Sequence, residues 1–131
     1  MDKTNRAILS LLKADARLSW QEIGKRVHLT GQAVASRVEK MQDQGLISGY
    51  TLRQNNAKRH FITVFMHSPA FSEFEAFLAA TEEVEAAYKT TGEGCYLVIW
   101  LESETHTLEA FLNALLRYGK YKVASAIRGV K

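Results

Sequence analysis

The chain has 131 residues, of which 47% are hydrophobic and 24% are charged, and its formal net charge is +3. This composition supports a packed core and excludes a disordered chain. The apolar runs are too short to cross a bilayer, no signal peptide is visible and one cysteine cannot form an internal disulfide, so we expect a cytoplasmic protein.

Charge is distributed unevenly along the chain. Residues 1–53 carry nine Lys and Arg against five Asp and Glu, a balance of +4, whereas residues 54–131 carry eight against nine, a balance of −1. A basic segment is a candidate for binding a polyanion such as DNA. Scattered surface charge explains the same imbalance about equally well when charge is considered alone.

Three short helices are predicted in the basic segment. The first ends near Ala14, and the second begins at the capping box Ser19-Trp20-Gln21-Glu22. The third begins after the cap residue Thr30 and ends at Gly45, a residue type suited to a left-handed C-cap. A tight turn therefore joins the second and third helices.

The third helix has an apolar face and a polar face. The apolar stripe consists of Val34, Val38 and Met41. Gln32 and Ser36 point the opposite way, and Arg37 and Lys40 flank them. This arrangement offers a polar edge to the DNA major groove, whereas an ordinary surface helix explains the pattern better if the helix is considered alone. For Arg37, DNA contact and an ion pair with a neighbouring helix are equal alternatives.

The residues after Gly45 alternate from Leu46 to Arg53, which predicts a β-strand that forms a wing. The capped short helix, the Leu29-Thr30 turn, the third helix and the run Gln44-Gly45-Leu46-Ile47-Ser48-Gly49-Tyr50 resemble the Lrp/AsnC family of bacterial and archaeal regulators. Nearly the whole chain fits this pattern. The resemblance implies that the third helix reads double-stranded DNA. It also implies a set of DNA-contacting residues: Trp20, Gln21, Thr30, Gln32, Ala33, Ser36, Arg37 and Lys40.

The remaining sequence predicts the order βαββαβ. Strands are expected at 61–67, 84–91, 95–102 and 121–128, and helices at 71–78 and 108–115. This order is the ferredoxin-like arrangement. We therefore expect an α+β protein with a winged helix-turn-helix domain at 1–53, a linker at 54–60 and a ferredoxin-like effector-binding and oligomerisation domain at 61–131.

The predicted sheet has one uncovered face. Two helices cover a single face, and Phe65, Tyr88, Val98 and Trp100 cannot all lie beneath them, although each one alone fits a monomer core. An uncovered apolar face usually marks an interface, so we expect a homodimer that presents two recognition helices to a symmetric operator. The family resemblance implies further assembly, commonly into octamers.

The resemblance also implies an effector site at the turn between the second and third strands, with an amino acid or another small metabolite as ligand. This turn usually reads Gly-x-x-Asp in the family. Here it consists of Gly92, Glu93, Gly94 and Cys95, with cysteine in place of the carboxylate.

No catalytic or cofactor motif is visible. The histidines are widely spaced, so they predict no metal site; they are His28, His60, His67 and His106. We expect no cofactor and no enzymatic activity. The alternative is an enzyme of the same architecture, because siroheme decarboxylases resemble Lrp/AsnC proteins in both halves. Such an enzyme is expected to cluster Arg and His in its C-terminal pocket.

Overall fold

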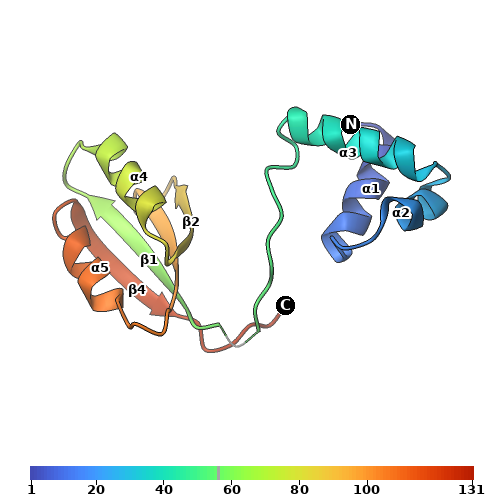
Figure 1. Cartoon of the computed structure of the whole chain (residues 1–131). Coiled ribbons are helices and arrows are strands. Elements are labelled where there is room, and N and C mark those ends of the chain that lie inside the picture. Colours follow the sequence, from blue (N-terminus) through green and yellow to red (C-terminus); the bar gives the residue numbers. More distant parts are fainter. Residues whose placement is uncertain (56) are drawn as a thin grey trace. The chain divides into compact units, whose positions relative to one another are not determined.

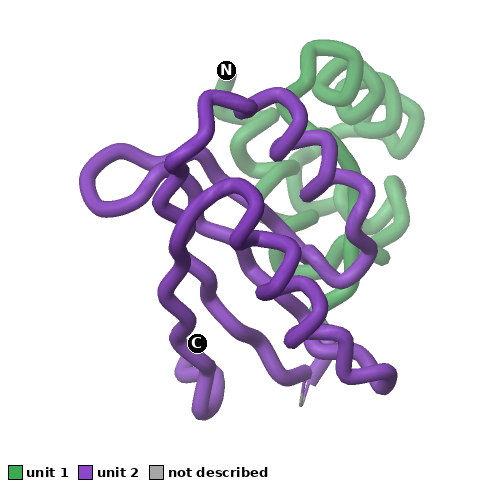
Figure 2. The backbone as a smooth tube through the Cα atoms, turned by 90° about the vertical axis from the view of Figure 1, so that its left-hand side faces the viewer, with its two compact units in different colours: residues 1–53 green, residues 54–131 purple. Residues whose placement is uncertain are grey.

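The computed structural model describes residues 1–55 and 57–131. They form two compact units, Met1–Arg53 and Gln54–Lys131, which Figure 2 shows in green and purple. Each unit has its own hydrophobic core, so each is described by itself. Within the described residues, no helix is long and apolar enough to cross a membrane.

Three helices form the first unit: α1 (Lys3–Ala14), α2 (Trp20–Val27) and α3 (Gly31–Asp43) (Figure 1). The predicted caps are confirmed, because the Ser19 hydroxyl accepts from the Glu22 N–H at 3.1 Å and the Thr30 hydroxyl accepts from the Ala33 N–H at 3.1 Å. Gly45 follows α3 with a φ of +77°, the left-handed conformation expected for a C-cap. Local signals therefore place the helices.

The predicted β-wing is wrong for the described chain. Residues 46–53 are described, but they form no strand. A strand needs a hydrogen-bonded neighbour, and every strand among the described residues belongs to the sheet of the second unit. The alternating pattern instead leaves Leu52 85% exposed and Tyr50 52% exposed.

The second unit is a four-stranded antiparallel sheet with two helices. Its elements in chain order are β1 (Arg59–Met66), α4 (Phe71–Ala80), β2 (Val84–Lys89), β3 (Tyr96–Leu101), α5 (Leu108–Leu115) and β4 (Gly119–Ser125). The strand order β2-β3-β1-β4 confirms the predicted ferredoxin-like arrangement. The first strand begins at Arg59, earlier than the predicted position 61.

The two helices cover only one of the two faces of the sheet. Val98 and Trp100 lie beneath the helices with 0% and 1% of their surface exposed, and the Trp100 ring centroid lies 4.5 Å from that of Phe111 on α5. Side chains alternate along a strand, so Phe65 and Tyr88 lie on the opposite face, where Tyr88 is 57% exposed. The large apolar side chains of this open face are Phe61, Phe65, Tyr88, Leu97, Ile99 and Leu101.

Candidate nucleic-acid interface

The turn between α2 and α3 is held by close backbone contact. His28 ends α2 in the left-handed conformation, with a φ of 61°, and the Leu29 N–H donates to the Gly24 carbonyl at 2.9 Å. A Cβ atom on Gly24 would lie 2.3 Å from the Leu29 carbonyl oxygen. Position 24 therefore requires glycine for the turn to pack in this way.

The same turn brings the N-terminal ends of α2 and α3 together. A Cβ atom on Gly31, the first residue of α3, would lie 3.2 Å from the backbone nitrogen of Gln21 in the first turn of α2. Helix N-termini carry unpaired N–H groups and partial positive charge, which favour phosphate. Trp20 and Gln21 are exposed beside this paired end, with Trp20 39% exposed.

Helix α3 buries one face and exposes the other. Its buried residues are Val34, Val38 and Met41. Gln32, Ser36 and Lys40 are exposed and lie four residues apart, so they form one stripe along the helix, while Ala33 is half-buried. The polar edge predicted from periodicity is therefore present on the folded helix.

Arg37 joins α3 to the start of α1. Its Nη1 atom donates to Asp2 Oδ2 at 2.9 Å and to Asn5 Oδ1 at 3.2 Å. The pKa of the Asp2 carboxyl is lowered, first by the hydrogen bond from the Asn5 backbone and then by the one from Arg37. Of the two alternatives for Arg37, the structure contains the ion pair with the neighbouring helix.

Changing Arg37 to glutamine is expected to lower the melting temperature at pH 7, because Asp2 loses its charged partner. The pKa of Asp2 is lower in the folded unit than in the unfolded chain. The charge of Asp2 therefore stabilises the folded unit fully at pH values above the unfolded-state pKa, and this stabilisation disappears as the pH falls through the folded-state pKa. The difference in melting temperature between the wild type and the Arg37→Gln variant should therefore become smaller at acidic pH. Lys25→Gln, an exposed change on α2, serves as the control. A difference that is the same at pH 7 and in strong acid would exclude Asp2 as its source.

The four residues predicted to bind an effector form a compact turn. Gly92 and Gly94 have φ values of +84° and +81°, which favour glycine. The Cys95 side chain is half-buried and packs against the sheet core. Glu93 Oε1 lies 3.0 Å from Lys122 Nζ on β4. The structure thus brings the four residues together, with Glu93 already paired.

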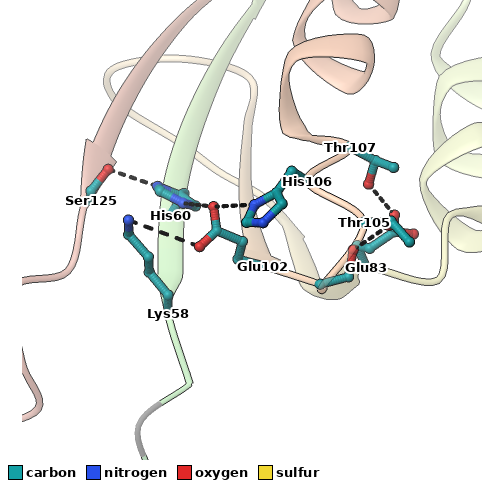
Figure 3. Close-up of polar contacts among 9 residues, drawn as sticks. Lys58, His60, Glu83, Glu102, Thr105, His106, Thr107 and Ser125 are labelled. Carbon is teal, nitrogen blue, oxygen red and sulfur yellow. Dashed lines mark hydrogen bonds and ion pairs between the residues drawn. The ribbon is translucent and has the colours of Figure 1, made fainter.

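A polar cluster at one end of the sheet was missed by sequence reasoning. The Glu102 carboxylate lies at its centre, with a side-chain nitrogen of each of three residues 3.8–3.9 Å from one of its oxygens (Figure 3). These residues are Lys58, His60 and His106. His60 is buried, and its Nδ1 atom lies 2.7 Å from the Ser125 hydroxyl on β4. Within the described part of the chain, no three His, Cys, Asp or Glu side chains are grouped to hold a metal ion. The cluster ties together the ends of three strands.

An open cavity of about 360 Å³, which we call the α4–β2 cavity, lies in the second unit. Its lining residues are Glu75, Leu78, Ala79, Val84, Ala86, Ala87, Tyr88, Lys89 and Tyr96. Two of these carry charge and most of the others are aliphatic. Sequence reasoning did not predict this cavity, because it forms only when α4 packs beside an edge strand.

Family models match both units of the chain. Residues 1–42 match the AsnC-type helix-turn-helix domain, and residues 59–129 match the Lrp/AsnC ligand binding domain. The chain belongs to the Lrp/AsnC family. Its first unit is thus an AsnC-type helix-turn-helix domain, as the capped helices indicated.

Lrp/AsnC relatives resemble this chain over nearly its full length. The HTH-type transcriptional regulator LrpB of Bacillus subtilis (strain 168) is 35% identical over 100% of this chain and 91% of its own length. LrpA of the same organism is 32% identical, over 97% of this chain and 98% of its own length. The solved structure of the Mycobacterium tuberculosis leucine response regulatory protein LrpA has the same fold, with a TM-score of 0.83 at 24% identity, covering 100% of this chain and 95% of that chain.

Another solved structure with this fold contains a small molecule. The regulator NMB0573 of Neisseria meningitidis, solved as its L-Met complex, has a TM-score of 0.82 at 24% identity. The structural match covers 100% of this chain and 92% of the NMB0573 chain. Both units of the Lrp/AsnC chain therefore have counterparts in solved structures.

Proposed function

We propose that this transcriptional regulator of the Lrp/AsnC type binds double-stranded DNA sequence-specifically, with α3 in the major groove. The exposed stripe of Gln32, Ser36 and Lys40 carries the proposal, because it lies on the helix whose other face is buried. Trp20 and Gln21, beside the paired helix N-termini, are proposed to contact phosphates. Phosphate contacts position the helix and base contacts specify the sequence.

Thr30 and Ala33 complete the proposed contact set. The Thr30 oxygen accepts from the Ala33 N–H, so its own O–H is free to donate to a phosphate oxygen. Ala33 is small enough to permit close approach of the groove, and its methyl group suits contact with a thymine methyl. Arg37 is proposed to act at the edge of this surface while it holds α1.

Alanine substitutions at Gln32 and at Lys40 are expected to weaken DNA binding in different ways. Gln32 has the amide geometry to pair with an adenine edge, so Gln32→Ala should cost about 1 to 3 kcal/mol on the preferred operator and much less on random DNA. Lys40→Ala should weaken binding to both DNAs similarly. It should also reduce the slope of log affinity against log salt by about 1, because one fewer phosphate is neutralised.

Titration of labelled operator and scrambled duplex at several salt concentrations tests this contrast. Arg26→Ala, on the exposed C-terminal turn of α2, is the control for loss of a positive charge. Equal losses on both DNAs for Gln32→Ala would identify Gln32 as a positioning residue and would remove it from base reading.

We propose that the second unit assembles the protein into a homodimer through the open face of its sheet, and that dimers assemble further into a higher oligomer such as an octamer. The apolar side chains of this face are partly exposed in the single chain, and Tyr88 is 57% exposed. Burial of such a face favours association by about 25 cal/mol per Å² of apolar surface. A two-fold dimer presents two copies of α3 to a symmetric operator.

The proposed effector is an amino acid or another small metabolite, bound near Gly92, Glu93, Gly94 and Cys95 at a subunit interface. The family model of a ligand binding domain and the L-Met complex of the Neisseria relative support this proposal. We propose no enzymatic activity. A polycarboxylate tetrapyrrole would favour a pocket rich in Arg and His, and neither residue lines the α4–β2 cavity among the described residues.

A further inference from the structure

The acidic and basic side chains of the second unit come from different parts of its chain. Residues 61–118 carry nine acidic side chains and two basic ones, whereas residues 54–60 and 119–131 carry six basic side chains and no acidic one. The six basic residues are Lys58, Arg59, Lys120, Lys122, Arg128 and Lys131. The second unit therefore contains a basic part, which consists of the end of the linker, β4 and the residues after β4.

Two segments of this basic part meet at one end of the sheet. The linker reaches β1 there, and the tail, residues 126–131, leaves β4 there. The Ala126 N–H donates to the Arg59 carbonyl at 2.9 Å. Beside this bond, the buried His60 ring places its Nδ1 atom 2.7 Å from the Ser125 hydroxyl (Figure 3). These contacts fix the start of the tail next to the end of the linker.

Three cations in and next to these two segments have no acidic partner. Arg53, Arg128 and Lys131 are exposed, and no acidic side chain among the described residues lies within salt-bridge distance of them. An arginine guanidinium carries five N–H donors in a planar fork that matches phosphate oxygens. The three side chains are therefore available to a polyanion.

The linker connects these cations directly to the helix-turn-helix unit. Lys58 follows Arg53 by five residues, which extend over at most roughly 18 Å. The helix-turn-helix unit itself carries a balance of +4. The covalent connection therefore limits how far the start of the tail can lie from a duplex that the first unit binds.

We propose that the linker and the tail form a second contact with double-stranded DNA, in which Arg53, Arg128 and Lys131 bind phosphates beside the site that α3 occupies. This inference rests on the proposed DNA binding by the first unit, and it adds a phosphate-binding role for part of the second unit. Phosphate contacts carry no sequence information, so these cations raise the affinity for every duplex to a similar degree.

Titration of the full chain with labelled operator and shuffled duplex at several salt concentrations tests this contact. Arg53→Gln and Arg128→Gln should each reduce the slope of log affinity against log salt by about 1, because each contacted phosphate contributes about 0.9. The double variant should lose about 2. Its affinity deficit relative to wild type should therefore shrink about tenfold between about 50 and 200 mM salt, and equally on both DNAs.

A matched double variant controls for the loss of net charge. Lys89→Gln combined with Arg117→Gln removes two exposed cations from the acidic part of the same unit, so it should leave the salt slope nearly unchanged. Both double variants should have the sedimentation coefficient of the wild type in the absence of DNA. Circular dichroism checks that they are folded.

A protein partner is the other occupant to test, because the tail also exposes Ile127 and Val130, 98% and 85% respectively. Ile127→Ser should change neither assembly nor DNA affinity if the tail contacts phosphates. A greater loss of DNA affinity for Ile127→Ser than for Arg128→Gln, or a changed sedimentation coefficient for Arg128→Gln, would assign the tail to a protein contact and overturn the proposal.

An unchanged salt slope in either single arginine variant would also overturn the proposal, as would a loss of affinity confined to the operator. The result is separate from sequence reading by α3. If α3 does not read sequence, the preference for operator over shuffled duplex disappears while the slope change in the arginine variants persists. If the tail does not contact DNA, the preference persists while the slope stays the same.

Discussion

A chain that ends at Arg53 is expected to be monomeric and to bind the preferred operator about 10²- to 10⁴-fold more weakly than the full chain. In a dimer, contact of the second recognition helix becomes intramolecular once the first has bound, and the shortened chain loses this advantage. The fragment keeps its own core, which contains Ile8, Ile23, Val34, Val38 and Met41. Its weakness should therefore come from lost assembly.

Analytical ultracentrifugation and operator titration measure both parts of this result. The full chain with Ile99→Asp on the open face is the matched variant, because a charge in the proposed interface should separate the dimer while both units stay folded. Its operator affinity should fall toward that of the fragment. A fragment that is dimeric in solution, or that binds as tightly as the full chain, would place assembly in the first unit.

Replacement of Gly24 by alanine is expected to destabilise the first unit by about 3 kcal/mol, the upper end of the range for an overpacked core. The added Cβ would lie 2.3 Å from the Leu29 carbonyl oxygen, and this oxygen belongs to the backbone of the turn. A loss of this size corresponds to a fall in melting temperature of about 10 °C or more for a small domain. DNA binding should weaken with it, because the turn sets α3 against α2.

Thermal unfolding followed by circular dichroism measures this effect. Gly49→Ala is the control within the same unit, because a Cβ at position 49 meets nothing within 4 Å. Its effect should stay within about 0.5 kcal/mol. If Gly24→Ala melts at the same temperature as Gly49→Ala, then the close contact at the turn does not determine the stability of the unit.

Much of the fold could be predicted because its signals are local. The hydroxyl caps Ser19 and Thr30 and the left-handed Gly45, which follows the C-cap of α3, lie at the helix ends themselves. The alternating runs mark the four strands of the sheet. The run from Leu46 to Arg53 has the same alternation, but a strand also requires a pairing partner, which local pattern does not encode. The wing prediction was wrong for this reason.

The candidate site was predictable to the extent that it lies on one helix. Helical periodicity is enough to put Gln32, Ser36 and Lys40 on an exposed stripe. Arg37 could not be assigned from sequence, because its partner Asp2 lies 35 residues earlier. The residues around Glu102 and those of the α4–β2 cavity come together only through strand register and helix packing.

Selection of duplexes from a random library by the full chain tests sequence-specific DNA binding most directly. We expect the recovered sequences to share one motif with two-fold symmetry. The protein should bind this motif at least about 10³-fold more tightly than a shuffled duplex at physiological salt. Gln32→Ala should lower this ratio and Lys40→Ala should leave it nearly unchanged. Recovery of unrelated sequences that bind no more tightly than the shuffled duplex would contradict sequence-specific recognition by α3.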